Sequence, residues 1–263
     1  MAVDDELKKR IHSEIERATV KIFVYNEFQG TGFFITPDGY LLTAYHCFDQ
    51  YPVFADNIII KTNFGKEFKA PFEEAKSSKL FDIAVLKVDE NISISLPLGV
   101  VSKEHIFDDI VALGYPAGHR DDNQQIGIYP GKISKFRDDF KIENNAIKGP
   151  GQSGGPVYHY PTKRIIGVAV EGYKSEVMTD TALAARIDPL FDKWSELQNI
   201  TAEVAKSWDE RLALFVPKEN KTTKVQQPVT KQIVNNKDAE IGTQNNFAGD
   251  INSLNMTFGS NKN

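Results

Sequence analysis

The stretch "GTGFFITPDGYLLTAYHC", residues Gly30–Cys47, decides how we expect the first part of the chain to fold. Two short apolar runs are separated by a turn that contains Pro37, Asp38 and Gly39. Short runs bounded by such turn residues are typical of antiparallel strands. His46 stands at the end of the second run, so the stretch places a titratable side chain directly after a strand.

Short apolar runs of the same kind continue from about residue 20 to residue 187. They include "TVKIFVY", "NIIIKT", "DIAVLKV", "DIVALGY", "KRIIGVAVEGY" and "TALAARI". Each run is bounded by Gly, Pro, Asn or Asp, as the strands of a barrel or sandwich are. The segment 96–109 is a candidate connection between two β subdomains. We therefore predict an all-β domain over residues 20–190, with subdomains at about 20–100 and 101–190.

Helical periods flank this β-rich region. Apolar residues recur four apart within residues 1–19, which predicts an amphipathic N-terminal helix. Apolar residues in 191–216 recur with a period of about 3.6, which predicts a C-terminal helix interrupted near 199–201.

The last part of the chain, residues 217–263, is a polar linker followed by an Asn-rich tail in which no packed core is expected. Leu254, Met256 and Phe258 alternate with polar neighbours, which is the period of a β-strand. One interpretation is a disordered tail. The other is a homotypic or adaptor contact through residues 232–263 that assembles or recruits the protein.

The composition is that of an ordinary globular protein, with 41% hydrophobic and 25% charged residues among 263. No apolar run is long enough for a transmembrane helix, so no membrane partner is expected. The net charge of −5 argues against nucleic acid as the main partner. The single cysteine excludes an intrachain disulfide, and the charged start lacks an apolar signal region. We therefore predict a cytoplasmic protein.

A second stretch, "GPGQSGGP" at Gly149–Pro156, holds Ser153 among four glycines. Glycine loses more conformational freedom on folding than any other residue, so this cluster calls for a functional reason. A nucleophilic serine needs a base, a carboxylate that orients the base, and backbone N–H groups that hold the oxyanion. Gly151 and Ser153 can supply the N–H groups. His46 can supply the base, and Asp82, which opens the most apolar strand, can supply the carboxylate.

These three contexts resemble, in their order along the chain, the trypsin-like (chymotrypsin-fold) serine peptidases. The matching motifs are T-A-x-H-C around His46, D-I-A from Asp82 and G-x-S-G-G-P around Ser153. The resemblance implies two six-stranded antiparallel β-barrels with the triad in the cleft between them. It also implies a serine endopeptidase acting on proteins or peptides without a cofactor or metal, in which Gly151 and Ser153 form the oxyanion hole.

The segment "VALGYPAG", residues 111–118, resembles the bacterial high-temperature-requirement proteases more than it resembles digestive trypsins. The family's PDZ domain has no counterpart in residues 191–263, which are too helical and then too polar. Gln152 stands where digestive relatives carry an aspartate that pairs with a newly released N-terminus, so activation by N-terminal cleavage is not expected. The usual disulfide partner of Cys47 is missing near residues 30–32, which favours a buried free thiol.

The substrate pocket is placed by alignment with the family, which gives its base at Ile147 and Lys148 and its walls at Val170, Glu171, Gly172 and Ala182. No acid falls at the position that trypsins use to bind Lys or Arg, so we predict an apolar P1 residue. Asp180 or Glu176 would instead favour a basic P1 residue.

The serine stretch has other interpretations. It also fits the G-x-S-x-G elbow of α/β-hydrolases, but that fold needs a histidine well after the serine, and only His159 follows. His12, His105, His119 and His159 carry no motif and are expected to be surface or satisfied core residues. The alternative to a bacterial effector or signalling peptidase is a catalytically silent protease-fold scaffold with an assembling tail.

Overall fold

We analysed a computed structural model that describes residues 5–51, 57–116, 125–137, 140–172 and 181–214. For residues 171 and 172 the backbone alone is described. In chain order the elements are α1 (Asp5–Ala18), β1 (Thr19–Val24), β2 (Glu27–Phe34), β3 (Tyr40–Thr43), η1 (Tyr45–Phe48), β4 (Ile58–Thr62), β5 (Glu67–Lys69), β6 (Ala84–Lys87), η2 (Lys103–His105), β7 (Asp109–Gly114), β8 (Gly127–Phe136), β9 (Lys141–Asn144), β10 (Pro156–His159), β11 (Arg164–Gly172), β12 (Ala182–Arg186), α2 (Asp188–Lys193) and α3 (Leu197–Ala213). The predicted tail lies outside the described residues.

The first β unit is a six-stranded antiparallel sheet in the order β5-β4-β1-β2-β3-β6. A two-residue hairpin joins β1 to β2, with Tyr25 and Asn26 at φ of 50° and 67°. The predicted turn at 37–39 joins β2 to β3, and Gly39 there has φ of 99°. The turn brings β3 beside β2, and β6 then pairs with β3, so the ends of β3 and β6 become neighbours.

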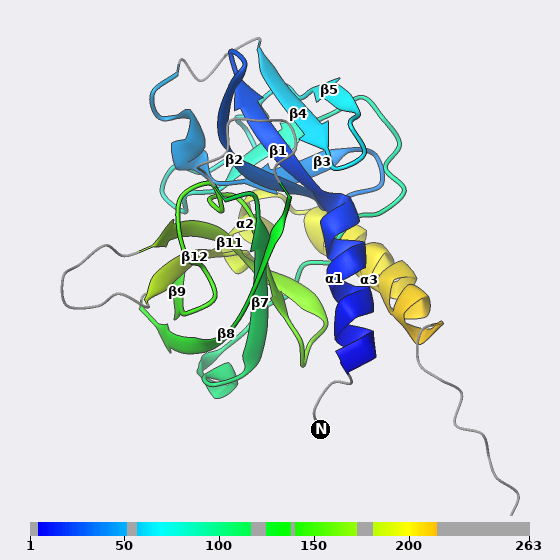
Figure 1. Cartoon of the computed structure of the whole chain (residues 1–263), viewed down its shortest axis with the longest axis vertical. Coiled ribbons are helices and arrows are strands. Elements are labelled where there is room, and N and C mark those ends of the chain that lie inside the picture. Colours follow the sequence, from blue (N-terminus) through cyan, green and yellow to red (C-terminus); the bar gives the residue numbers. More distant parts are fainter. Residues whose placement is uncertain (1–4, 52–56, 117–124, 138–139, 173–180, 215–263) are drawn as a thin grey trace, which may run out of the picture. The chain divides into compact units, whose positions relative to one another are not determined.

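The second β unit is a closed barrel in the order β10-β11-β12-β9-β8-β7. Every pairing in it is antiparallel. Segment 96–109 connects the two units as predicted, and Leu98 forms a parallel bridge with Ile165 of the barrel. Figure 1 shows the two units one above the other, with α1 and α3 beside them. The predicted all-β, double-barrel fold with flanking helices is therefore confirmed, with the second barrel closed and the first present as an open six-stranded sheet, a half-barrel.

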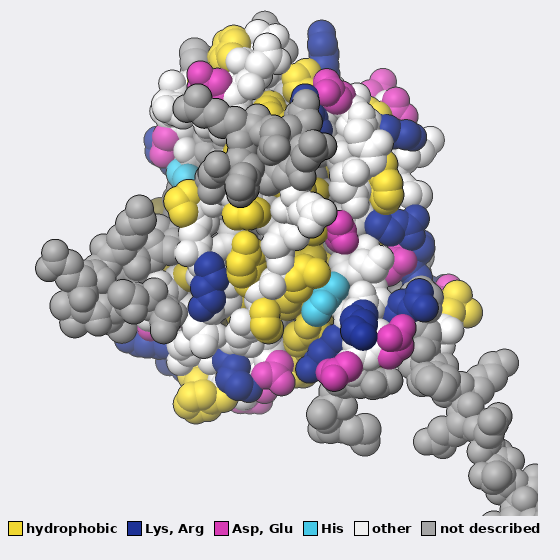
Figure 2. All heavy atoms as spheres, in the orientation of Figure 1, with side chains coloured by type: hydrophobic (Ala, Val, Ile, Leu, Met, Phe, Trp, Pro, Cys, Tyr) yellow, Lys and Arg dark blue, Asp and Glu magenta, His cyan; other side chains and the backbone are white. Residues whose placement is uncertain are grey.

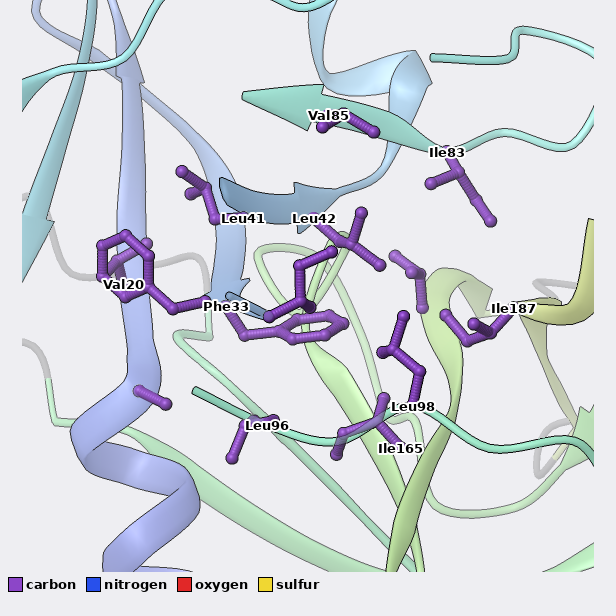
Figure 3. Packing of buried hydrophobic residues seen from close by; sticks show 14 of the residues in the cluster. Val20, Phe33, Leu41, Leu42, Ile83, Val85, Leu96, Leu98, Ile165 and Ile187 are labelled. Carbon is purple, nitrogen blue, oxygen red and sulfur yellow. The ribbon is translucent and has the colours of Figure 1, made fainter. Parts of the chain in front are cut away.

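One buried hydrophobic cluster reaches from the first sheet into the second barrel. In Figure 3 the Phe33 ring of β2 and the Leu42 side chain of β3 point toward Leu98, Ile165 and Ile187. All five side chains are at most 4% exposed. A second, smaller cluster fills the interior of the barrel alone. The shared cluster is what fixes one β unit against the other, because apolar area buried between them drives their association.

The C-terminal helical region is interrupted earlier than the sequence pattern indicates. The helix α2 ends at Lys193 with Trp194 as its C-cap, and α3 begins at Leu197 and runs through 199–201. The Trp194 ring packs at 4.8 Å from the Tyr40 ring and is 6% exposed, so burying this side chain sets the position of the break. Thr201 lies within α3, and its hydroxyl accepts a hydrogen bond from the Leu98 N–H at 2.7 Å.

The described helices include none with both the length and the apolar character needed to cross a bilayer. On the face shown in Figure 2, acidic and basic side chains are interspersed around a band of hydrophobic residues. That face therefore offers no concentrated charge of one sign.

Candidate active site

His46 lies in the short helix η1, directly after β3, where the sequence predicted it. Its ring Nδ1 is 2.9 Å from Asp82 Oδ2 and 3.1 Å from Oδ1, and its backbone N–H donates to Asp82 Oδ1 at 2.9 Å. A carboxylate can only accept hydrogen bonds, so Nδ1 carries the ring proton and Nε2 is the basic nitrogen. The His46 side chain is 37% exposed, so solvent or a ligand can reach it.

Asp82 stands just before β6, the strand that pairs with β3. Its φ of 56° lies in the left-handed region, which aspartate tolerates better than most residues. The Asp82 carbonyl accepts the Tyr45 N–H at 3.3 Å, while its carboxylate accepts two donors from His46. These bonds hold the carboxylate against the imidazole and offset the cost of the unfavourable backbone conformation.

Ser153 lies in the glycine-rich loop before β10, and a single glycine separates it from the region of His46. A Cβ atom placed on Gly30 would lie 2.6 Å from the Ser153 carbonyl oxygen and 3.0 Å from Cys47 Sγ. Cys47 is the residue after His46, so the Ser153 backbone lies close to the segment that carries His46. The Ser153 hydroxyl oxygen is 3.4 Å from the Val170 carbonyl oxygen. This distance is at the upper limit for a hydrogen bond.

The loop around Ser153 has the backbone form that only glycine adopts easily. Gly151 and Gly154 have φ of 88° and 86°. Gly154 N–H donates to the Ala169 carbonyl at 2.7 Å, and Gly155 N–H donates to the Gln152 carbonyl at 2.8 Å. In the described part of the chain, the N–H groups of Gly151 and Ser153 donate to no other protein group. The described residues therefore leave the donor capacity of these two N–H groups unused.

Gln152 is a residue whose role the sequence did not predict. It is 1% exposed, and its Oε1 accepts the backbone N–H groups of Lys148 at 2.5 Å and Gly149 at 2.9 Å. The Gln152 side chain therefore holds its own part of the loop against the residues where the loop begins. No released N-terminus is needed to hold it, which agrees with the predicted absence of activation by cleavage.

The family pattern described as the trypsin-like peptidase domain matches residues 30–168, more than half of the chain. The chain belongs to the trypsin-like peptidase family. This confirms the resemblance drawn from the motifs at His46, Asp82 and Ser153.

Among relatives of this peptidase domain, a probable periplasmic serine endoprotease DegP-like of Pseudomonas savastanoi pv. phaseolicola is 29% identical over 188 residues. Its counterpart in Halomonas elongata is 30% identical over 183 residues. Each alignment covers 68% of this chain but 36% and 37% of the relative, so the chain spans little more than a third of their length. The crystal structure of the serine endoprotease from Yersinia pestis superposes with a TM-score of 0.60 at 21% identity, covering 75% of this chain and 68% of that one. It supports the fold.

The names of these relatives contradict the predicted cytoplasmic location, because each is described as periplasmic. The prediction depended mainly on the presence of one cysteine. A lone cysteine cannot form an intrachain disulfide in any compartment, so its count does not distinguish an oxidising from a reducing one. The cytoplasmic assignment of this trypsin-like peptidase is therefore wrong by this comparison.

The predicted pocket residues of the peptidase domain fall into different environments. Ile147 and Ala182 are buried together in the barrel core, and Val170 is buried in the shared cluster. Lys148 is exposed. The backbones of Glu171 and Gly172 pair with β12, and the Glu171 side chain lies outside what is described. Glu176 and Asp180 also lie outside the described residues, so the pocket stays a prediction.

Asn144 is a second residue that sequence reasoning missed. It is fully buried, and its Oδ1 accepts the backbone N–H groups of Ala146 at 3.0 Å and Ile147 at 3.3 Å. Its amide nitrogen lies 3.4 Å from the Ala182 carbonyl. The asparagine therefore links the two segments that were predicted to form the pocket.

A second His–Asp pair shows why geometry alone does not make an active site. His159 Nε2 is 3.1 Å from Asp108 Oδ2, and its Nδ1 is 2.9 Å from Thr162 Oγ1. The His159 side chain is fully buried, and burial lowers its pKa. It is a satisfied core histidine, as predicted, whereas His46 is open to a ligand.

Cys47 is a buried free thiol, as predicted. Burial, and after it the nearby Asp82 charge, raises its pKa to about 12, so the thiol stays protonated and unreactive near neutral pH. Within the residues that the structure describes, no group of three or more His, Cys, Asp or Glu side chains could hold a metal ion.

Proposed function

We propose that the chain is a serine endopeptidase that hydrolyses peptide bonds in proteins through His46, Asp82 and Ser153. The observation that carries the proposal is the partly exposed His46 imidazole held by Asp82, in a segment whose next residue, Cys47, lies across Gly30 from the Ser153 backbone. The names of the relatives, which are serine endoproteases, support the same reaction.

The chemical steps follow from the position of each group. His46 Nε2 accepts the Ser153 hydroxyl proton as Oγ attacks the carbonyl carbon of the substrate. A C–O bond forms, and the carbonyl oxygen takes the negative charge of the tetrahedral intermediate. The N–H groups of Gly151 and Ser153 hold this oxyanion. His46 then passes the proton to the leaving amine, the C–N bond breaks, and an acyl-enzyme remains.

The second half of the reaction repeats these roles with water as the nucleophile. His46 removes a proton from water, the hydroxide attacks the acyl carbon, and Ser153 leaves with the proton. Asp82 keeps the proton on Nδ1 and stabilises the imidazolium that forms at each step. The carboxylate remains ionised throughout.

The substrate class that we propose is a protein or an unfolded peptide segment with an apolar P1 residue. Ile147, Val170 and Ala182 are apolar, which supports this preference over a basic P1 residue. The role as a bacterial effector or signalling peptidase depends on residues 232–263, which lie outside the described residues. The same holds for the homotypic or adaptor contact and for the scaffold alternative.

The test is to compare the wild-type protein with Ser153→Ala on casein and on a fluorogenic peptide library. We expect Ser153→Ala to lose about 10⁴-fold or more in kcat, because the nucleophile is gone. Ser207→Ala, an exposed serine on α3, is the control and should keep wild-type activity. Equal cleavage by wild type and Ser153→Ala would show that Ser153 is not the nucleophile, and no cleavage by either under matched conditions would favour the scaffold alternative.

A further inference from the structure

Thr31, on β2, lies where the first sheet meets the loop that holds Ser153. It is fully buried, and its backbone N–H donates to the Ser153 carbonyl at 2.8 Å. Its hydroxyl donates to the Gly151 carbonyl at 2.8 Å and accepts the Tyr115 N–H at 3.0 Å. Its own carbonyl accepts the Thr43 hydroxyl at 2.7 Å. Thr31 thus bonds to both β units and to two residues of the loop.

The peptide that contains the Gly151 carbonyl needs a restraint from outside the loop. Gly151 has φ of 88° and no side chain, so its own covalent structure does not fix its peptide planes. Its carbonyl belongs to the peptide that lies between the two predicted oxyanion donors, the N–H groups of Gly151 and Ser153. Because this peptide is joined covalently to the residues on both sides, a displacement of it would shift the position of at least one of these N–H groups relative to the substrate.

The geometry points to Thr31 as a positioning residue: we propose that its hydroxyl fixes the Gly151 peptide so that both N–H groups face the oxyanion. The inference rests on the proposed peptidase function and extends it to a residue that touches no reacting atom. The hydroxyl is well suited to this role, because it donates to the Gly151 carbonyl and accepts the Tyr115 N–H at the same time.

The space around the loop shows that the contact is tight. A Cβ on Gly154 would overlap both the Thr31 carbonyl oxygen and the Thr43 hydroxyl oxygen. The loop is therefore pressed against β2 along the length from Gly151 to Gly154. A change in the Thr31 hydroxyl should reach the oxyanion donors directly, since no gap is available to absorb it.

The experiment replaces Thr31 by valine, which has a similar shape but removes the hydroxyl, and by serine, which keeps it. We expect Thr31→Val to lower kcat on a fluorogenic peptide roughly 10- to 100-fold, with KM changed less than about twofold, because the oxyanion is bound in the transition state. Affinity for a peptide aldehyde, whose hemiacetal oxygen occupies the oxyanion position, should fall by a similar factor. Thr31→Ser should restore kcat to within about threefold of wild type.

The matched control is Thr36→Val. Thr36 is also a fully buried threonine, and its hydroxyl accepts the Tyr40 N–H at 2.9 Å, but it does not contact the loop. It should lose stability as Thr31→Val does while keeping wild-type kcat. If Thr31→Val does not fold, Thr31→Ala removes the same hydroxyl without requiring space for a second methyl group.

The outcomes separate the two proposals. An active wild type with an inactive Ser153→Ala supports the peptidase function whatever Thr31 does. If Thr31→Val then keeps wild-type kcat, or if Thr31→Ser is as impaired as Thr31→Val, the positioning role is wrong. If neither the wild type nor any variant cleaves peptide or binds the aldehyde, the proposed function itself fails.

Discussion

Asp82 shows at the scale of a residue how one side chain combines a structural cost with a chemical use. Its φ of 56° is unfavourable, and its carboxylate is 21% exposed beside the imidazole of His46. Left-handed backbone at a residue other than glycine costs on the order of 1–3 kcal/mol. Such strain persists where the surrounding bonds fix it, as the three hydrogen bonds to Tyr45 and His46 do here.

Asp82→Asn is the substitution that isolates the chemical role. Asparagine has the same shape and also tolerates a positive φ, so the fold should be kept. The amide can donate to Nδ1, which would place the ring proton on Nε2 and remove the base. We expect kcat at pH 7 to fall by about 10⁴-fold, measured with a fluorogenic peptide.

The control for this substitution is Asp49→Asn, which removes a nearby carboxylate that pairs with Lys79 at 2.8 Å. Its kcat should stay within about twofold of wild type. An Asp82→Asn variant that retains more than a tenth of the wild-type kcat would show that Asp82 does not set the tautomer of His46.

The candidate triad could be proposed from the sequence because each of its residues stands in a short local motif. The contacts of Thr31, Gln152 and Asn144 could not, because each depends on partners that the fold brings close. The hydroxyl of Thr31 bonds to residues that are 84 and 120 positions away. No local spacing in the sequence indicates such a contact.

Four of the eight residues in the loop 149–156 are glycine. Its glycines are not equivalent. A Cβ on Gly154 would overlap neighbouring oxygens and its φ is 86°, whereas a Cβ on Gly149 would meet nothing within 4 Å. The cluster that looked uniform in sequence therefore divides into a position that requires glycine and one that does not.

Gly154→Ala and Gly149→Ala form a matched pair that tests this division. We expect Gly154→Ala to lose about 3 kcal/mol or more of unfolding free energy, because strain and overlap add. Gly149→Ala should change it by less than about 1 kcal/mol, since alanine restricts the unfolded chain without a clash. Urea unfolding followed by circular dichroism measures both, and equal effects would contradict the loop geometry described above.

Element boundaries were predicted less well than the elements themselves. The β-rich runs became strands because their alternation and turn residues are local signals. The break between α2 and α3 falls at Trp194 rather than near 199–201, because a ring contact with Tyr40 in another element decides it. Periodicity cannot report such a contact.

At the scale of the whole molecule, the shared hydrophobic cluster joins the two β units into one folding unit. Phe33 of the first sheet and Ile165 of the barrel belong to the same buried cluster. The two tryptophans report on separate regions. Trp194 packs on the Tyr40 ring of β3, whereas the ring centroid of Trp208 lies 6.1 Å from that of Tyr158 in β10. The chain therefore carries a natural probe for each β unit.

We expect both β units to unfold together. Trp194→Phe leaves Trp208 as the reporter, and Trp208→Phe leaves Trp194. In each variant, fluorescence and far-UV circular dichroism should give the same urea midpoint, because the shared core couples the units. A fluorescence midpoint in one variant that differs from its own circular dichroism midpoint would show that the units unfold separately.

The claim on which the account depends is that Ser153 is an activated nucleophile. Reaction of the wild-type chain with a fluorophosphonate probe, followed by peptide mapping, tests it most directly, because the probe labels an activated serine and not an ordinary one. We predict a single adduct on Ser153 that is absent in Ser153→Ala and strongly slowed in His46→Ala. No labelling of the folded protein, or labelling that His46→Ala leaves unchanged, would contradict the account.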